Sequence, residues 1–139
     1  MYRLLLILGV GLLFIGCRHE VRYEPPPPMT PDRITDLKDA WVSLYSDSNF
    51  TGDKLTVKYP NTQPDLGAVK SDNGTLSGFA KETKSAKWQI PEGWQAVLYD
   101  DGDFSGNKYP LFGTGKVESN DDLGTFAGKA TSIRWERKP

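Results

Sequence analysis

The sequence predicts an all-β sandwich that is preceded by a signal segment and a proline-rich tether. Three observations indicate this organisation: an apolar run at the N-terminus, a block of prolines behind it, and a pair of matching segments in the rest of the chain. The strand signals in that last part are short and bounded by Gly, Asn, Asp or Pro, as in β-sandwiches. We expect a signal peptide over residues 1–16, a linker over 17–39 and one β domain over 40–139.

The first residues are typical of a secretory signal. Arg3 supplies a positive charge, and the thirteen residues from Leu4 to Gly16 are apolar. A membrane-spanning helix needs about 20 such residues, so this run is too short to span a bilayer. The run ends at Cys17, which is the only cysteine in the chain.

The stretch FIGC, which ends at Cys17, resembles the lipobox of bacterial lipoproteins. The resemblance implies cleavage after Gly16 and lipid modification of Cys17, which would hold the exported protein at a membrane. Arg18 follows in place of an aspartate, and by analogy with enterobacterial sorting this favours the outer membrane or the cell surface. The alternative is an ordinary signal peptide whose cysteine falls at this position by chance.

The segment after the cysteine is typical of an extended spacer. Residues 25–28 are all proline, and Pro31 follows closely. Such a run favours the polyproline II conformation and excludes helix. At about 3.1 Å per residue, the segment could hold a domain roughly 60 Å from its lipid anchor. A ligand for a proline-binding domain is the alternative use.

The composition argues against two classes of function. The chain has 17 basic and 18 acidic residues and no basic block after the signal, so we expect no nucleic-acid partner. The expected β domain contains neither histidine nor cysteine, which removes the usual general base and thiol nucleophile. Asp100 and Asp101 are adjacent carboxylates, but neighbouring residues of a strand point to opposite sides. We therefore expect that the protein is not an enzyme.

The β domain contains alternating apolar and polar residues over 41–45 (WVSLY), 54–59 (KLTVKY) and 95–99 (QAVLY). Such alternation predicts strands with one face in a core and the other in solvent. The hairpins behind the first and third of these strands are nearly identical in sequence, LYSDSNFTG and LYDDGDFSG. Three positions recur at a spacing of 54 residues: Tyr45 and Tyr99, Phe50 and Phe104, and Gly52 and Gly106.

A second matching pair of segments follows the hairpins. SDNGTLSGFAKETKSAKW ends at Trp88 and aligns without gaps with ESNDDLGTFAGKATSIRW, which ends at Trp135, 47 residues later. Because the two spacings differ by seven, the first copy holds seven additional residues between its hairpin and its closing strand. We expect a tandem duplication, with motif 1 over 40–90 and motif 2 over 91–137.

Each repeated residue has an expected structural role. The tyrosine ends a strand, and the glycine takes a positive φ, which costs other residues about 1 kcal/mol or more. The phenylalanine ring can cover the hairpin. Ser85 and Ser132 precede the closing strands, where a hydroxyl can bond the backbone of the folded hairpin. One copy cannot bury its apolar face alone, so two copies are needed.

The pattern Y-x4-F-x-G, followed by a serine before a closing apolar strand, resembles the Greek-key motif of the βγ-crystallin family. It occurs as YSDSNFTG with SAKW and as YDDGDFSG with TSIRW, and the resemblance covers about residues 40–136. It implies a sandwich of about eight strands built from two Greek keys. The two fold-defining sets are Tyr45, Phe50, Gly52 and Ser85, and Tyr99, Phe104, Gly106 and Ser132.

Many microbial members of this family bind calcium through N/D-N/D-x-x-S/T-S, and this sequence departs from that pattern. Before Ser132 the chain reads AGKAT, so only the hydroxyl of Thr131 remains. Before Ser85, Lys84 occupies the position of the expected ligand. Calcium takes about six to eight oxygen ligands. The resemblance places a weak calcium site on Thr131, with carbonyls near Asp47 and Ser48; the alternative is that these residues serve turns alone.

Two functions from different classes fit such a domain. In the first, it is a structural or protective module displayed at the cell surface. In the second, it recognises a protein or a glycan, or inhibits a secreted hydrolase. Trp94 follows the PEG turn, and a ring exposed there beside Tyr99 or Tyr109 would provide a stacking surface for such a partner. Trp88 and Trp135 occupy equivalent positions, so we expect both in the core.

Overall fold

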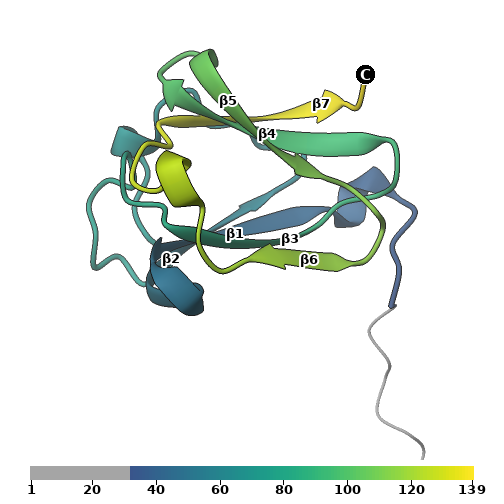
Figure 1. Ribbon diagram of the computed structural model, residues 1–139, viewed down its shortest axis with the longest axis horizontal. Coiled ribbons are helices and arrows are strands. Elements are labelled where there is room, and N and C mark those ends of the chain that lie inside the picture. Colours follow the sequence, from purple (N-terminus) through teal and green to yellow (C-terminus); the bar gives the residue numbers. More distant parts are fainter. Residues whose placement is uncertain (1–31) are drawn as a thin grey trace, which may run out of the picture. The chain divides into compact units, whose positions relative to one another are not determined.

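The structure is a computed structural model that describes residues 32–139 (Figure 1). The expected signal peptide, Cys17 and most of the linker lie outside these residues. Among residues 32–139 the helical elements are short 3₁₀ turns, and none is long and apolar enough to cross a membrane. The strands are β1 (Trp41–Asp47), β2 (Thr51–Lys58), β3 (Ser85–Gln89), β4 (Trp94–Asp101), β5 (Ser105–Phe112), β6 (Val117–Asn120) and β7 (Ser132–Arg137).

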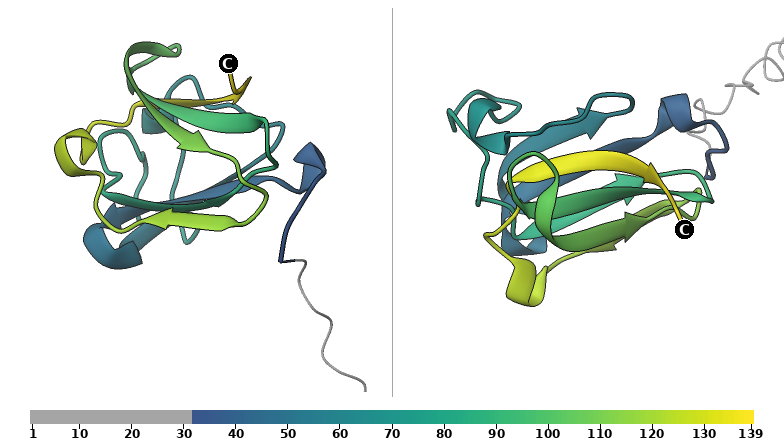
Figure 2. Two further views of the ribbon diagram at one scale, coloured as in Figure 1. Left: turned by 45° about the vertical axis from the view of Figure 1, so that its right-hand side comes forward. Right: turned by 90° about the horizontal axis from the view of Figure 1, so that it is seen from above.

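The strands form two antiparallel sheets that stack face to face (Figures 1 and 2). One sheet has the order β2-β1-β3-β6 and the other the order β5-β4-β7. β6 belongs to the second copy of the motif but pairs with β3 of the first, with Glu118 opposite Trp88. In return, Gln63 of the first copy forms a bridge with Ile133 in β7. Each sheet therefore contains residues of both copies.

The sequence predicts about eight strands, and the described part of the chain contains seven strands and one isolated bridge. At the bridge, Gln63 N donates to Ile133 O and Ile133 N donates to Gln63 O, both at 3.0 Å. Pro60 and Pro64 lie on either side of it and have no backbone N–H to donate to a ladder. Pairing at this edge of the sheet is therefore confined to one residue.

The core fills the space between the sheets with alternate residues of each strand. Ala96 and Leu98 of β4, for example, are fully buried in it. Trp88 and Trp135 are 9% and 8% exposed and belong to the same core, which confirms the expectation from their equivalent positions. Trp88 Nε1 donates to the carbonyl of Phe112 (2.9 Å), and Trp135 Nε1 donates to a carbonyl of the first copy (2.7 Å). The indole of each copy thus bonds the other copy.

The residues just before β1 also pack on the sandwich. Ile34 is buried in the core, and its N–H donates to Gly115 O at 2.8 Å. Arg33 Nη1 donates to Thr114 O, also at 2.8 Å. Arg33 and Ile34 therefore belong to the folded unit, although they precede the expected start of the β domain at Ala40.

Candidate functional site

The two repeated serines, Ser85 and Ser132, each hold the hairpin of their own copy. Ser85 Oγ donates to Asp47 O at 2.6 Å and accepts from Phe50 N at 3.0 Å. Ser132 Oγ donates to Asp101 O at 2.6 Å and accepts from the N–H of Phe104 at 3.1 Å. Both hydroxyls lie on fully buried residues. This is the contact that the sequence analysis expects of them, and it engages each hydroxyl as both donor and acceptor.

The aromatic pair and the glycine complete each hairpin. The Tyr45 and Phe50 rings meet edge to face at 5.8 Å, and the corresponding rings of the second copy, Tyr99 and Phe104, meet at 6.1 Å. The two glycines have φ of +81° and +84°, as expected. Sequence reasoning missed that both phenylalanines also have positive φ, near +59° and +58°. The surrounding contacts hold these bulky residues in a region that they seldom adopt.

The residues proposed for calcium are engaged in hydrogen bonds and in an ion pair. The carbonyl of Asp47 accepts from the Ser85 hydroxyl, and the carbonyl of Ser48 accepts from Thr51 Oγ1 at 2.7 Å. The Asp47 carboxylate lies 3.9 Å from the Lys84 ammonium, a positive charge that opposes a cation there. Thr131 Oγ1 instead donates to a neighbouring backbone carbonyl at 3.1 Å.

Thr131 also makes backbone hydrogen bonds on both sides, and its carbonyl accepts from Leu66 N of the first copy at 2.8 Å. The N–H of Thr131 donates to Tyr99 O at 2.7 Å, within its own copy. Within residues 32–139 no hydrogen bond joins Thr131 to Asp47 or Ser48, and no three His, Cys, Asp or Glu side chains are grouped to hold a metal ion. The hydroxyls and carbonyls that would bind calcium serve the turns.

The expected stacking surface is not formed by Trp94, Tyr99 and Tyr109. Trp94 packs partly against the core, with the Arg137 guanidinium 5.1 Å from its ring centre. Tyr109 also packs against the core, and its ring lies 5.2 Å from that of Phe126. Tyr99 is only 1% exposed. These three rings therefore cannot present one aromatic surface, because β4 directs its alternate residues to opposite faces.

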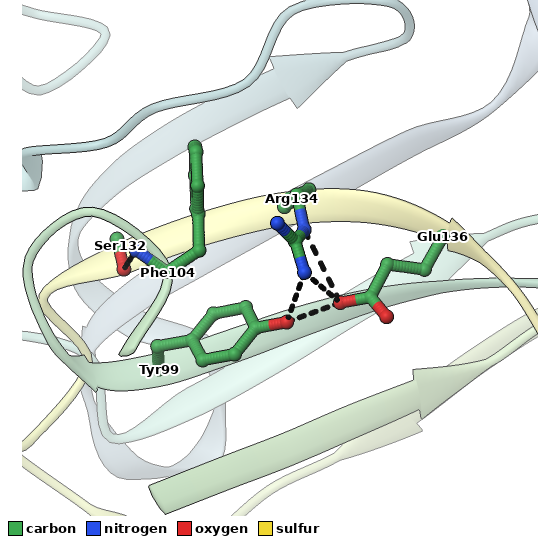
Figure 3. Close-up of polar contacts among 5 residues, drawn as sticks. All are labelled: Tyr99, Phe104, Ser132, Arg134 and Glu136. Atoms are coloured by element: carbon green, nitrogen blue, oxygen red, sulfur yellow. Dashed lines mark hydrogen bonds and ion pairs between the residues drawn. The ribbon is translucent and has the colours of Figure 1, made fainter. Parts of the chain in front are cut away.

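Tyr99 lies on the outer face of the β5-β4-β7 sheet, which we call the outer sheet face. Figure 3 shows its hydroxyl between the side chains of Arg134 and Glu136 from β7. The hydroxyl donates to Glu136 Oε2, and Arg134 Nη2 donates to both, at 3.1 Å to Tyr99 Oη and 3.3 Å to Glu136 Oε2. Burial, followed by the hydrogen bond to Glu136, raises the pKa of Tyr99.

The Arg134 guanidinium also covers the aromatic pair of the second hairpin. Its central carbon lies 5.5 Å from the Tyr99 ring centre and 5.0 Å from that of Phe104. A cation over an aromatic face is attracted by the ring electrons. The same guanidinium also bonds the Glu136 carboxylate, so the negative charge of Glu136 is compensated within the sheet.

A cavity of about 440 Å³ opens on the outer sheet face. Its lining includes Gln95 and Val97 of β4, Phe112 of β5 and Arg137 of β7. Gln95 is 6% exposed, and its buried Oε1 has no hydrogen-bond partner among the described residues. Phe112, in contrast, is 46% exposed. Most buried polar atoms in proteins are paired, so this glutamine is a candidate binding group.

Sequence reasoning missed Gln95 and Phe112. Strand alternation places Gln95 on the same face as Val97 and Tyr99, which is a signal that the sequence contains. The register that sets Phe112 opposite Gln95 depends on the hairpin, whose bulge shifts the pairing between Tyr99 and Asp101. That shift cannot be read from the alternation alone.

Comparison with known proteins supports the fold. No family model and no curated protein sequence matches the chain. A solved βγ-crystallin domain from Flavobacterium johnsoniae is 24% identical, with a TM-score of 0.50 over 70% of this chain and 94% of that one. The βγ-crystallin from Ciona intestinalis is 22% identical (TM-score 0.50; 69% and 99%), and the N-terminal domain of Protein S is 19% identical (TM-score 0.50; 71% and 98%). The described part of the chain therefore has the βγ-crystallin fold, with two Greek-key motifs.

Proposed function

We propose that the chain is an exported lipoprotein that presents a non-catalytic βγ-crystallin domain at a membrane surface, in a structural or protective role. The observation that carries the non-catalytic part is the use of the hydroxyls at the hairpins. Ser85 and Ser132 are fully buried and donate to backbone carbonyls, whereas a nucleophilic serine must be accessible and paired with a general base.

The carboxylate best placed for acid–base chemistry is also engaged in structure. The side-chain amide of Asn107, and then its backbone N–H, donate to Asp100. These hydrogen bonds keep the pKa of Asp100 below its ordinary value. A general acid at neutral pH needs a raised pKa, so this environment favours a turn cap over a catalytic group.

The lipid anchor rests on the sequence FIGC and on the length of the apolar run before it. Bacterial cells that express the full chain can be labelled with an alkyne fatty acid and then separated into inner and outer membranes. We expect the wild type to carry the label and to sediment with membranes, with the outer membrane as the main fraction.

Cys17→Ala removes the only thiol and should abolish both the label and the sedimentation. Cys17→Ser is the matched control, because it keeps the size of the side chain but cannot form a thioether. A Cys17→Ala protein that remains labelled would show that the anchor assignment is wrong.

A second function, recognition of a partner, is favoured by one specific observation. The outer sheet face combines a cavity, a buried glutamine oxygen without a partner and an exposed phenylalanine ring.

A further inference from the structure

The cavity on the outer sheet face has the size of a small-ligand site. Its volume of about 440 Å³ lies within the roughly 300–1,000 Å³ that is usual for such sites. Gln95 stands in the middle of a row that runs across the three strands, with Phe112 opposite it on β5 and Glu136 opposite it on β7. A ligand placed over Gln95 would therefore meet a ring on one side and charged side chains on the other.

The Gln95 amide suits a hydroxyl group. An amide offers both an acceptor and two donors, and a hydroxyl can donate and accept in turn. The terminal torsion of a glutamine is broad and roughly two-fold. Rotation about it can therefore present either the oxygen or the NH₂ group to the cavity. Once rotated toward the cavity, the oxygen that is unpaired among the described residues can accept from a sugar hydroxyl.

A second buried glutamine, in the other sheet, shows what a closed arrangement looks like. Gln89 in β3 is 8% exposed, close to the 6% of Gln95. Its Nε2 donates to Gly115 O at 3.0 Å. The protein thus pairs one buried glutamine internally and leaves the oxygen of the other, at the cavity, without a partner in the part that the structure describes.

The wall of the cavity offers a flat apolar surface. Phe112 is 46% exposed, and Pro110 on the same strand also lines the cavity. The carbonyl of Phe112 is fixed by Trp88 Nε1 at 2.9 Å, so the backbone below the ring is held in place. The C–H face of a pyranose ring is flat and apolar and can pack on such rings.

The charge on this face favours an anion. Lys108 and Arg137 line the cavity, and the Lys138 ammonium lies 5.1 Å from the Phe112 ring centre. The one carboxylate side chain in the lining, Glu136, is already bonded by Arg134 and Tyr99. The positive charges at the rim therefore exceed the negative charge that remains available to a ligand.

We propose that the outer sheet face binds an acidic sugar, with its ring on Phe112, a hydroxyl at Gln95 and its carboxylate at Lys108 and Arg137. The three parts of this site call for a ring with an apolar face, hydroxyl groups and a negative charge, and a uronate sugar combines all three. This inference rests on the recognition function proposed above. Its failure would leave the lipid anchor untouched, because labelling at Cys17 is measured separately.

Titration calorimetry on the full-length chain in a neutral detergent tests the site, with galacturonate trisaccharide as the probe. We expect binding that weakens as salt is added, since exposed charges are screened. The neutral galactose trisaccharide should bind at least about tenfold more weakly, which corresponds to about 1.4 kcal/mol.

Two variants with matched controls locate the site. Phe112→Ala should weaken galacturonate binding about tenfold or more, whereas Val117→Ala, at a 55% exposed apolar residue of the other sheet, should leave it unchanged. Lys108→Glu should weaken it to a similar extent. Its control is Lys54→Glu, because Lys54 faces Tyr45 on β1 as Lys108 faces Tyr99 on β4.

Three results would overturn the proposal. The first is the absence of any heat of binding at about 10 mM galacturonate trisaccharide, a concentration well above the dissociation constant of a weak specific site. The second is equal affinity for the acidic and neutral trisaccharides. The third is unchanged binding in both Phe112→Ala and Lys108→Glu, each checked for a native circular dichroism spectrum.

Discussion

Ser132 has no solvent contact and completes two hydrogen bonds that the hairpin backbone cannot make within itself. The same holds for Ser85 in the first copy. An alanine at either position would leave an N–H and a carbonyl of the hairpin without their hydroxyl partner. This explains at the level of single atoms why both copies of the motif carry serine.

Ser132→Ala should lower the free energy of unfolding by about 1–3 kcal/mol, the cost of leaving buried polar groups unsatisfied. Urea denaturation followed by tryptophan fluorescence measures this change. Ser119→Ala, at an exposed serine on β6, is the control and should stay within about 0.5 kcal/mol of the wild type. Equal effects of the two substitutions would show that the hydroxyl contact contributes nothing.

Gly106 combines a positive φ of +84° with a close neighbour, since a Cβ added there would meet the Asp100 carboxylate. Gly93 has nearly the same φ of +87° but nothing within 4 Å of the added atom. Gly106→Ala should therefore lower the thermal midpoint more than Gly93→Ala. Both substitutions introduce the same backbone strain, so the difference between their thermal midpoints measures the collision of the new Cβ with the Asp100 carboxylate. Equal midpoints would rule out the close approach.

At the scale of the elements, strands β4 and β7 are joined on the outer sheet face by Tyr99, Arg134 and Glu136. In the first copy, the positions that match Arg134 and Glu136 in the sequence alignment hold Lys87 and Gln89. The hairpins of the two copies are therefore equivalent, while the outer faces of their sheets are not. This difference gives the second sheet a titratable cluster that the first lacks.

The raised pKa of Tyr99 predicts a loss of stability in alkali. The hydroxyl ionises at about pH 10 in the unfolded chain and at a higher pH in the folded chain. Its contribution is therefore complete below about pH 10 and is lost as the pH rises through the folded pKa. Urea denaturation from pH 8 to 11 should show a shallower alkaline decline for Tyr99→Phe than for the wild type.

If Tyr99→Phe keeps the alkaline slope of the wild type, the Tyr99 hydroxyl does not titrate differently in the folded and unfolded chains.

At the scale of the whole molecule, calcium should make no difference to stability. The carbonyls of Asp47 and Ser48 already accept hydroxyl hydrogens, and the Lys84 ammonium stands at the Asp47 carboxylate. A site filled at a hundred times its dissociation constant would add about 2.7 kcal/mol. We expect the thermal midpoint in millimolar calcium to match that in chelator, and a rise of several degrees would contradict this account.

Much of the fold could be predicted from the sequence because its signals are local. The turn residues, the glycine at Gly106 and the serine at Ser132 recur at fixed spacings, and their roles depend on neighbours within one copy. The exchange of β6 and Gln63 between the sheets depends on contacts between the copies, and the repeated residues do not predict it. The cavity at Gln95 could not be predicted, because it forms where side chains of three strands converge.

The two copies of the motif depend on each other, and we expect neither to fold alone. β6 pairs with β3, Gln63 bridges Ile133, and the indoles of Trp88 and Trp135 bond across the copies. Amide hydrogen exchange on the separate fragments 32–90 and 91–139, compared with the intact chain, measures this dependence. We expect protected strand amides in the intact chain and none in either fragment. Protected amides throughout β4 and β7 in the isolated 91–139 fragment would contradict it.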